Sequence, residues 1–138
     1  MSFDPETWLQ VAGICTSNIP GVSREALLRT AVNRAYYAAL LALKDRIEVA
    51  QGPGSVPAWG THTALKQAVE TAGASFKDVD LRLTWLRHAR ERADYDLAND
   101  EIEFHRVRAM IRITRWLIRN RIKALPEAEF RRLRVPRG

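Results

Sequence analysis

The sequence has little of what builds β-sheets or membrane spans. No run alternates β-branched and polar residues, and no Asn-Gly or Asp-Gly pair marks a hairpin, which argues against a sheet protein. No apolar run approaches the roughly 20 residues that a helix needs to cross a bilayer. We therefore expect a helical protein that makes no use of a membrane.

Cysteine and the common cofactor motifs are also scarce. Cys15 is the single cysteine, so it forms no internal disulfide, and no other cysteine or histidine lies near it at ligand spacing. The chain contains no P-loop, GxGxxG, HExxH or CxxC pattern. Its first residues carry neither the basic nor the apolar segment of a signal peptide. We expect no metal, no cofactor and a cytoplasmic location.

What is present is the composition of one globular domain. The chain has 138 residues, of which 46% are apolar and 28% are charged. Apolar residues recur at helical spacing over about residues 5–17, 24–50, 61–72, 77–93 and 101–124. These segments predict an all-α fold, a compact bundle of about five helices. We expect this domain to cover residues 1–125 and a basic tail, frayed from the bundle, to cover residues 126–138.

The positive charge is concentrated near the C-terminus. Residues 105–138 hold 11 basic and 2 acidic residues (+9), and residues 1–104 hold 11 basic and 14 acidic residues (−3), which together give the net charge of +6. This asymmetry favours RNA or another polyanion as partner, although a solvated helix face with a basic tail would have the same charges. On a helix over 101–124, Arg108, Arg112, Arg115, Arg119 and Lys123 form one stripe about 80° wide. As nucleic-acid-binding residues we select the four arginines of this stripe. The remaining apolar face is broad, which favours a homodimer.

A dense polar cluster occupies residues 85–96. Metal-independent RNA cleavage needs a group that moves protons and a cation that binds phosphate, roles that suit histidine and arginine. Here Arg87, Arg90 and Arg92 are candidate phosphate ligands. Asp94 lies four residues after Arg90 and can orient it, and Tyr95 can donate a hydrogen bond to phosphate. The nearby His88 falls inside the predicted helix.

Three further residues are candidates for a pocket. Asn33 and Tyr37 lie four apart beside the apolar stripe of the 24–50 segment, and His62 lies in the first turn of the 61–72 segment. The alternatives are a buried tyrosine whose hydroxyl has a partner and a surface or capping histidine. A nucleotide pocket lined by Asn33, Tyr37 and Arg90 is a weaker hypothesis, because no Gly-rich phosphate loop accompanies it.

Two segments together resemble a known family. The run Arg-Ala-Tyr-Tyr-Ala at residues 34–38 and the run Arg-x-x-Ala-Asp-Tyr at residues 90–95 are similar to motifs of the HEPN (higher eukaryotes and prokaryotes nucleotide-binding) family. The resemblance extends over roughly residues 20–122. It implies a bundle of about five helices that dimerises, and many members of the family are ribonucleases of toxin or defence systems, often encoded beside a nucleotidyltransferase.

Matched to the family's catalytic motif, Arg90 is the arginine and Glu91 is the polar residue that follows it, where the family usually has asparagine. Tyr95 stands where the family has its histidine. The resemblance implies Arg90, Asp94 and Tyr95 as the catalytic set of a metal-independent endoribonuclease, and leaves open whether RNA is bound without being cleaved. The alternative function is a non-catalytic interaction or regulatory protein that acts with a nucleotidyltransferase or an antitoxin.

Overall fold

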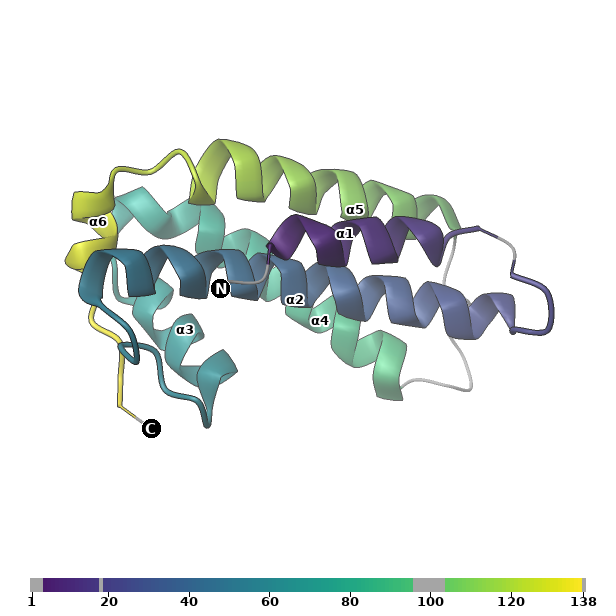
Figure 1. The fold of residues 1–138 in the computed structure, drawn as a ribbon, viewed down its shortest axis with the longest axis horizontal. Coiled ribbons are helices and arrows are strands. Elements are labelled where there is room, and N and C mark those ends of the chain that lie inside the picture. Colours follow the sequence, from purple (N-terminus) through teal and green to yellow (C-terminus); the bar gives the residue numbers. More distant parts are fainter. Residues whose placement is uncertain (1–3, 18, 96–103, 138) are drawn as a thin grey trace.

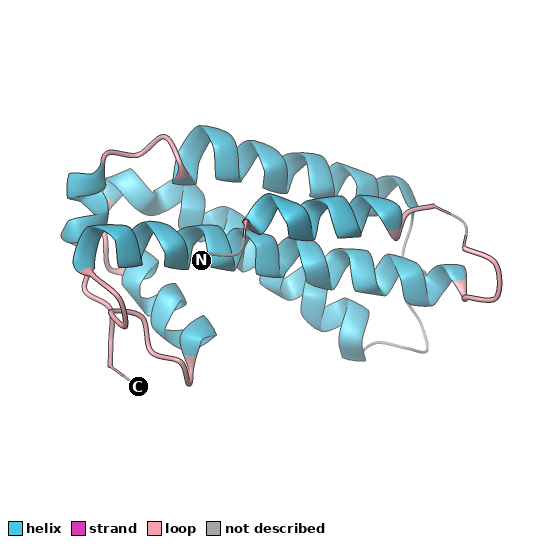
Figure 2. Cartoon of the chain, in the orientation of Figure 1, coloured by secondary structure: helices cyan, strands magenta, loops and turns pink. Residues whose placement is uncertain are grey.

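The computed structural model describes residues 4–17, 19–95 and 104–137, and at residues 93–95 it describes the backbone alone. Within these ranges every regular element is a helix (Figure 2). In chain order the elements are α1 (Pro5–Ile14), α2 (Arg24–Gln51), α3 (Thr61–Glu70), the short 3₁₀ helix η1 (Ala74–Phe76), α4 (Lys77–Tyr95), α5 (Phe104–Leu117), the π-helical turn η2 (Ile118–Ile122) and α6 (Glu127–Arg131). The prediction of an all-α bundle is confirmed. No helix in the described part of the chain is long and apolar enough to cross a membrane.

The long helix α2 is the axis of the bundle. The Ser23 hydroxyl caps its first turn by accepting a hydrogen bond from the Ala26 amide. Along its 28 residues it contacts α1, α3, α4, α5 and α6 (Figure 1). Small side chains make close helix packing possible, because the buried residues of α2 include Ala31, Ala35, Ala38, Ala39 and Ala42. The alanine-rich sequence of α2 thus explains why so many elements pack on one helix.

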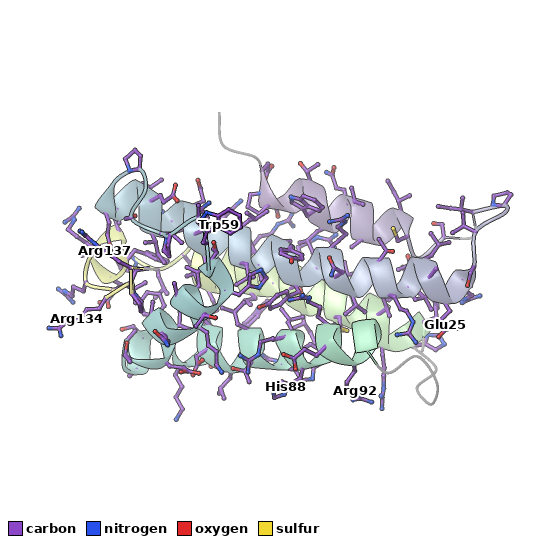
Figure 3. All side chains as sticks on the ribbon, turned by 90° about the horizontal axis from the view of Figure 1, so that it is seen from below. Glu25, Trp59, His88, Arg92, Arg134 and Arg137 are labelled. Atoms are coloured by element: carbon purple, nitrogen blue, oxygen red, sulfur yellow. The ribbon has the colours of Figure 1, made fainter. Side chains whose placement is uncertain are left out.

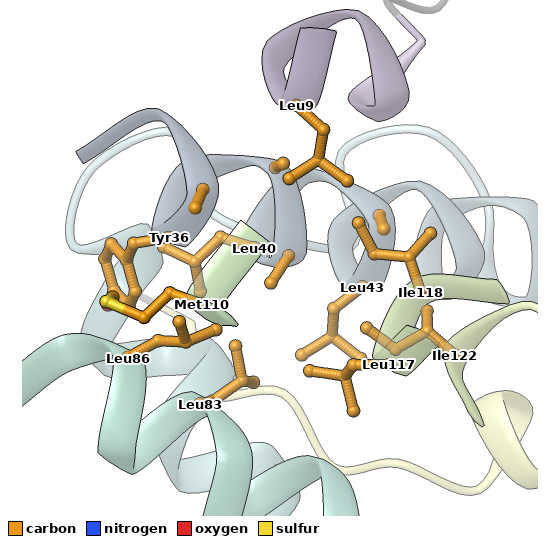
Figure 4. Close-up of a cluster of buried hydrophobic side chains, with 14 of the residues drawn as sticks. Leu9, Tyr36, Leu40, Leu43, Leu83, Leu86, Met110, Leu117, Ile118 and Ile122 are labelled. Carbon is orange, nitrogen blue, oxygen red and sulfur yellow. The ribbon is translucent and has the colours of Figure 1, made fainter. Parts of the chain in front are cut away.

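The core lies where the other helices pack against α2, and Figure 4 shows a part of it. Leu43 of α2 and Leu86 of α4 are fully buried there, as is Leu117 at the end of α5. Full burial of a leucine side chain stabilises a fold by about 1.5–3 kcal/mol relative to exposure. The apolar periodicity seen in the sequence therefore corresponds to a real, shared core.

Helix α4 differs from its prediction at its C-terminal end. We expected it to end near Ala93 with a bend from Asp94, but the helical backbone continues through Tyr95. The sequence also left open whether Trp85 joins the inward face, and the structure places it outside that face, with a side chain that is 43% exposed. Val79, Leu83 and Leu86 already form the buried line at helical spacing, and Trp85 lies about 100° away from Leu86 around the axis.

The fifth helix is interrupted before it ends. A regular helix to residue 124 was expected, but α5 ends at Leu117 and the chain makes a π-helical turn, in which the Lys123 amide donates to the Ile118 carbonyl at 2.8 Å. Ile118 and Ile122, the first and last residues of this turn, are both fully buried. It also interrupts the regular α-helical spacing on which the stripe prediction depended. Residues 101–103, where the helix was expected to begin, lie outside the described residues.

The expectation of a frayed C-terminal tail is wrong. Residues Glu127–Arg131 form α6, and Phe130 is fully buried with its ring 5.3 Å from that of Phe76 in an edge-to-face contact. The Gln51 side-chain amide donates to the carbonyls of Phe130 and Leu133 at 2.8 Å each, and an Arg46 nitrogen donates to the Leu125 carbonyl at 2.7 Å. The buried Phe130 ring and these hydrogen bonds hold the C-terminal segment on the bundle, although arginines surround it in the sequence.

Candidate functional site

A half-open hollow lies between α2, α3 and α4. Its volume is about 330 Å³, and its lining residues are Tyr36, His62, Thr63, Arg87, Arg90 and Glu91. Tyr36 comes from α2, His62 and Thr63 from the first turn of α3, and the charged residues from consecutive turns of α4. The hollow therefore brings together a tyrosine, a histidine and two arginines from three helices that are separate in the sequence.

The loop before α3 sets the position of His62. Gly60 has a φ of +70°, a left-handed conformation that few other residues adopt, and it is the N-cap residue of α3. The Thr61 hydroxyl donates to the Pro57 carbonyl at 2.7 Å. Ala64, Leu65, Ala68 and Val69 are buried and anchor the helix. The start of α3 is thereby held beside α2 with His62 turned towards the tyrosines.

His62 lies against two tyrosine rings. Its Nδ1 is 3.1 Å from the Tyr36 hydroxyl, and the rings of Tyr36 and His62 are 5.5 Å apart. The Tyr37 ring meets His62 edge-to-face at 5.2 Å. Since Nδ1 is occupied by Tyr36, Nε2 is the nitrogen that remains for a ligand in the hollow.

Arg90 covers the same tyrosines from α4. Its guanidinium carbon is 5.3 Å from the centre of the Tyr36 ring and 5.5 Å from that of the Tyr37 ring. Cation–π contacts of this kind stabilise the cation and restrict its position. Arg90 is thus held over the aromatic pair while it lines the hollow.

Arg87 contributes a second guanidinium one turn earlier. Its Nε is buried and has no hydrogen-bond partner among the described residues. The nearest acidic group is Glu91, whose Oε1 lies 3.8 Å from this nitrogen, an ion-pair distance too long for a hydrogen bond. A buried donor without an acceptor is costly, and the nearby negative charge of Glu91 offsets part of that cost.

The electrostatics of the hollow keep both proton-carrying groups neutral near pH 7. Burial lowers the pKa of His62 below its usual 6.5, and the positive charge of Arg90 lowers it further. Burial raises the pKa of Tyr36 above its usual value, although the charges of Arg90 and Arg87 oppose this shift. The site thus presents a neutral imidazole beside a protonated phenol and two permanent cations.

A narrow cavity continues behind the hollow, between α3 and α4. Lys66, Asp80 and Thr84 line it together with Arg87. Burial raises the pKa of the Asp80 carboxyl, and the charge of Glu70 raises it further. Arg87 therefore has an acidic residue in this cavity and another, Glu91, at the hollow.

Some of the residues selected from the sequence meet in the structure and others do not. Arg87, Arg90, Tyr37 and His62 come together. Asn33 is half-buried on α2 and does not line the hollow. His88 and Arg92 are exposed on the outer side of α4, away from the cluster (Figure 3). The side chains of the two other predicted catalytic residues, Asp94 and Tyr95, lie outside the described residues.

The arginines selected on the fifth helix do not join the hollow. Helices α5 and α3 lie on opposite sides of α2 (Figure 1). Arg108 and Arg112 are exposed, Arg115 is half-buried, and Arg119, in the π-helical turn, forms an ion pair with Glu6 of α1. The Arg108 guanidinium lies 5.6 Å from the centre of the Phe104 ring. The predicted nucleic-acid-binding residues therefore fall on two separate surfaces.

Sequence reasoning did not select Tyr36 and Thr63 as site residues. Tyr36 fits the buried stripe of α2, and it is indeed only 3% exposed, which concealed the role of its hydroxyl. The Tyr36-Tyr37 pair was a usable signal, because two adjacent tyrosines on one helix place hydroxyl groups on different sides of it. In the described residues, no group of three or more His, Cys, Asp or Glu side chains is arranged to hold a metal.

Comparison with known proteins adds no relative. No protein-family model, curated protein or solved structure matches the chain.

Proposed function

We propose that this chain is a HEPN-like RNA-binding protein that cleaves RNA without a metal ion at the hollow between α2, α3 and α4. The observation that carries the proposal is the meeting of His62 and Arg90 in one hollow, with the Tyr36 hydroxyl 3.1 Å from the His62 ring. The family resemblance concerns the same residues of α2 and α4, and it gives the proposal a biological setting in a toxin–antitoxin or defence system.

The arginines bind the scissile phosphate. A guanidinium carries a permanent charge and donates two parallel hydrogen bonds to phosphate oxygens. Arg87 and Arg90 lie three residues apart on α4 and both line the hollow. The charge that develops on phosphate in the transition state is stabilised by the same two side chains.

His62 moves the proton. Neutral imidazole accepts the proton of the RNA 2′-hydroxyl at Nε2. Its Nδ1 keeps its own proton and donates a hydrogen bond to the Tyr36 oxygen. The 2′ oxygen then attacks the adjacent phosphorus, the bond from phosphorus to the 5′ oxygen breaks, and the leaving 5′ oxygen takes up the proton that His62 had accepted, which returns the imidazole to its neutral form. The products are a 2′,3′-cyclic phosphate and a 5′-hydroxyl end. Because the pKa of His62 is lowered, the basic form is the dominant one at neutral pH.

Under this proposal the proton-transfer role that the resemblance would give to Tyr95 belongs to His62. Tyrosine is a poor base near pH 7, since its ordinary pKa is about 10. Histidine has the suitable pKa, and His62 approaches Arg90 from another helix. A histidine then still transfers the proton, but it is His62 of α3 and not a residue at the position of Tyr95 on α4.

The proposal is tested by incubating the purified protein with RNA in EDTA, beside Arg90→Gln and Tyr95→Phe. We expect cleavage by the wild type and by Tyr95→Phe, and its loss in Arg90→Gln. Equal cleavage by Arg90→Gln would mean that the activity does not come from the hollow, and absence of cleavage by the wild type would reduce the proposal to RNA binding.

A second candidate function is that of an interaction protein, which acts with a nucleotidyltransferase, an antitoxin or a second copy of the chain. Exposed apolar side chains on α4 and α5 favour it: Leu81 is 58% exposed, Trp85 43% and Trp116 39%. Arg82 and Arg121 flank the Trp116 ring at 5.8 and 5.0 Å. Aromatic and arginine side chains are typical of protein interfaces. Light scattering tests for the homodimer, and co-expression with neighbouring genes tests for the other partners.

A further inference from the structure

Trp59 is the most exposed large apolar side chain among the described residues, with 88% of its surface accessible. It belongs to the loop between α2 and α3, three residues before His62. Consecutive Cα atoms are about 3.8 Å apart, so its Cα lies within about 11 Å of that of His62. Figure 3 shows Trp59 beside the start of α3, the helix whose first turn lines the hollow.

The loop holds this tryptophan in place. Val56 is buried, with 3% exposure, and anchors the loop in the core. The Thr61 hydroxyl donates to the carbonyls of Pro57 and Ala58 at 2.7 and 3.2 Å, on the residues that lead into Trp59. Gly60, in its left-handed conformation, follows directly. An indole ring that is 88% exposed is therefore displayed on a braced turn.

We propose that Trp59 is a stacking platform for an unpaired base next to the phosphate bound in the hollow, so that the protein selects single-stranded RNA. This inference rests on the proposed function, since it takes the hollow as the phosphate site. An exposed ring three residues before His62, which lines the cationic hollow, adds aromatic stacking to backbone attraction, the two features that bind single strands. Bases within a duplex are stacked on each other and cannot reach such a ring.

The roles of the two kinds of residue differ in their response to salt. Arg87 and Arg90 neutralise phosphate, so their loss lowers the slope of log affinity against log salt by about one per contact. Stacking releases no counterion, and removal of the indole lowers affinity without a change in slope. Loss of one stacked base typically weakens binding by about five-fold or more.

The experiment measures the affinity of a labelled 12-nucleotide RNA, single-stranded and in a duplex, at several salt concentrations, with every 2′-hydroxyl methylated so that the proposed reaction cannot cleave it. It compares the wild type with Trp59→Ala, Trp59→Phe and Arg90→Gln. The matched control is Trp85→Ala, which removes another exposed tryptophan, located on α4. We expect Trp59→Ala to lose affinity for the single strand alone, at an unchanged salt slope, and Trp59→Phe to retain most of it. Melting temperatures should not change, because the ring is exposed.

Two results would overturn the inference while leaving the proposed function intact: unchanged single-strand affinity in Trp59→Ala alongside weakened binding in Arg90→Gln, or an equal loss for single strand and duplex. Failure of the wild type to bind either RNA would overturn the proposed function as well.

Discussion

The Tyr36 hydroxyl lies 3.1 Å from Nδ1 of His62, and this contact joins residues 26 positions apart. A tyrosine hydroxyl can both donate and accept a hydrogen bond, so it suits either tautomer of the imidazole. Tyr36 is therefore a positioning residue for His62, comparable to the groups that orient the histidine in other acid–base sites.

Removal of this hydroxyl in Tyr36→Phe should reduce RNA cleavage about ten-fold or more, because the imidazole loses the hydrogen-bond partner that holds its ring in position. The free energy of unfolding should fall by only about 1 kcal/mol, the usual value of one hydrogen bond. Tyr37→Phe is the matched control, since Tyr37 contacts His62 through its ring edge. Similar cleavage rates for the two variants would refute the positioning role.

The pKa of His62 should lie below 6.5, and Arg90→Gln should raise it, because the Arg90 charge is the second cause of its depression after burial. A histidine that is harder to protonate when folded stabilises the protein above its unfolded pKa. That stability should be lost as the pH falls from about 6.5 through the folded pKa. NMR titration of the imidazole measures the pKa of His62 in the wild type and in Arg90→Gln. Denaturant unfolding at several pH values measures the change in stability. If the pKa of His62 is the same in the wild type and in Arg90→Gln, the Arg90 charge does not act on His62 and the prediction is wrong.

Phe130→Ala should destabilise the protein by about 3–5 kcal/mol, the usual cost of removing a fully buried phenylalanine. The reason is that the Phe130 ring packs against Phe76 and lies under the Arg46 guanidinium at 4.8 Å. The exposed neighbour Arg131 is the control, and Arg131→Ala should change stability by less than about 0.5 kcal/mol. Denaturant unfolding would decide the matter, and a negligible effect of Phe130→Ala would restore the expectation of a tail that does not contribute to the fold.

Arg87→Gln and Arg119→Gln should affect RNA binding differently. Arg87 lines the hollow with an unsatisfied Nε, whereas Arg119 pairs with Glu6 on the side of the bundle that α1 and α5 form. We expect the salt slope of binding to fall by about one in Arg87→Gln and to stay unchanged in Arg119→Gln. A larger change in Arg119→Gln would place the RNA along α5, where the basic stripe first suggested it.

The helices were predictable because their signals are local. Ser23 caps α2, and the apolar spacing of Leu28, Val32, Leu43 and Ile47 requires only a regular helix. The π-helical turn after Leu117 and the packing of Phe130 were not predictable, since both depend on neighbours supplied by distant segments. The sequence around Phe130 would be the same whether its ring is buried against Phe76 or exposed to solvent.

The candidate site was predictable in its arginines but not in its arrangement. Arg87 and Arg90 belong to the dense polar cluster of residues 85–96. Because they are three residues apart on a helix, their spacing alone places them side by side. His62 was selected only as a candidate for a pocket separate from the arginines, because its contact with Tyr36 depends on how α3 docks against α2 and α4. Local sequence around position 62 contains no information about that docking. The search for a histidine within the 85–96 cluster therefore led to Tyr95 and His88.

The central claim is that His62 transfers the proton in RNA cleavage. The most direct measurement compares the cleavage rates of wild type, His62→Gln, Tyr95→Phe and His88→Gln in EDTA, with analysis of the RNA ends produced. The account predicts that His62→Gln alone loses about a hundred-fold or more in rate, and that the wild type leaves 2′,3′-cyclic phosphate ends. Full activity in His62→Gln, with loss of activity in Tyr95→Phe, would contradict the account and return the proton transfer to α4.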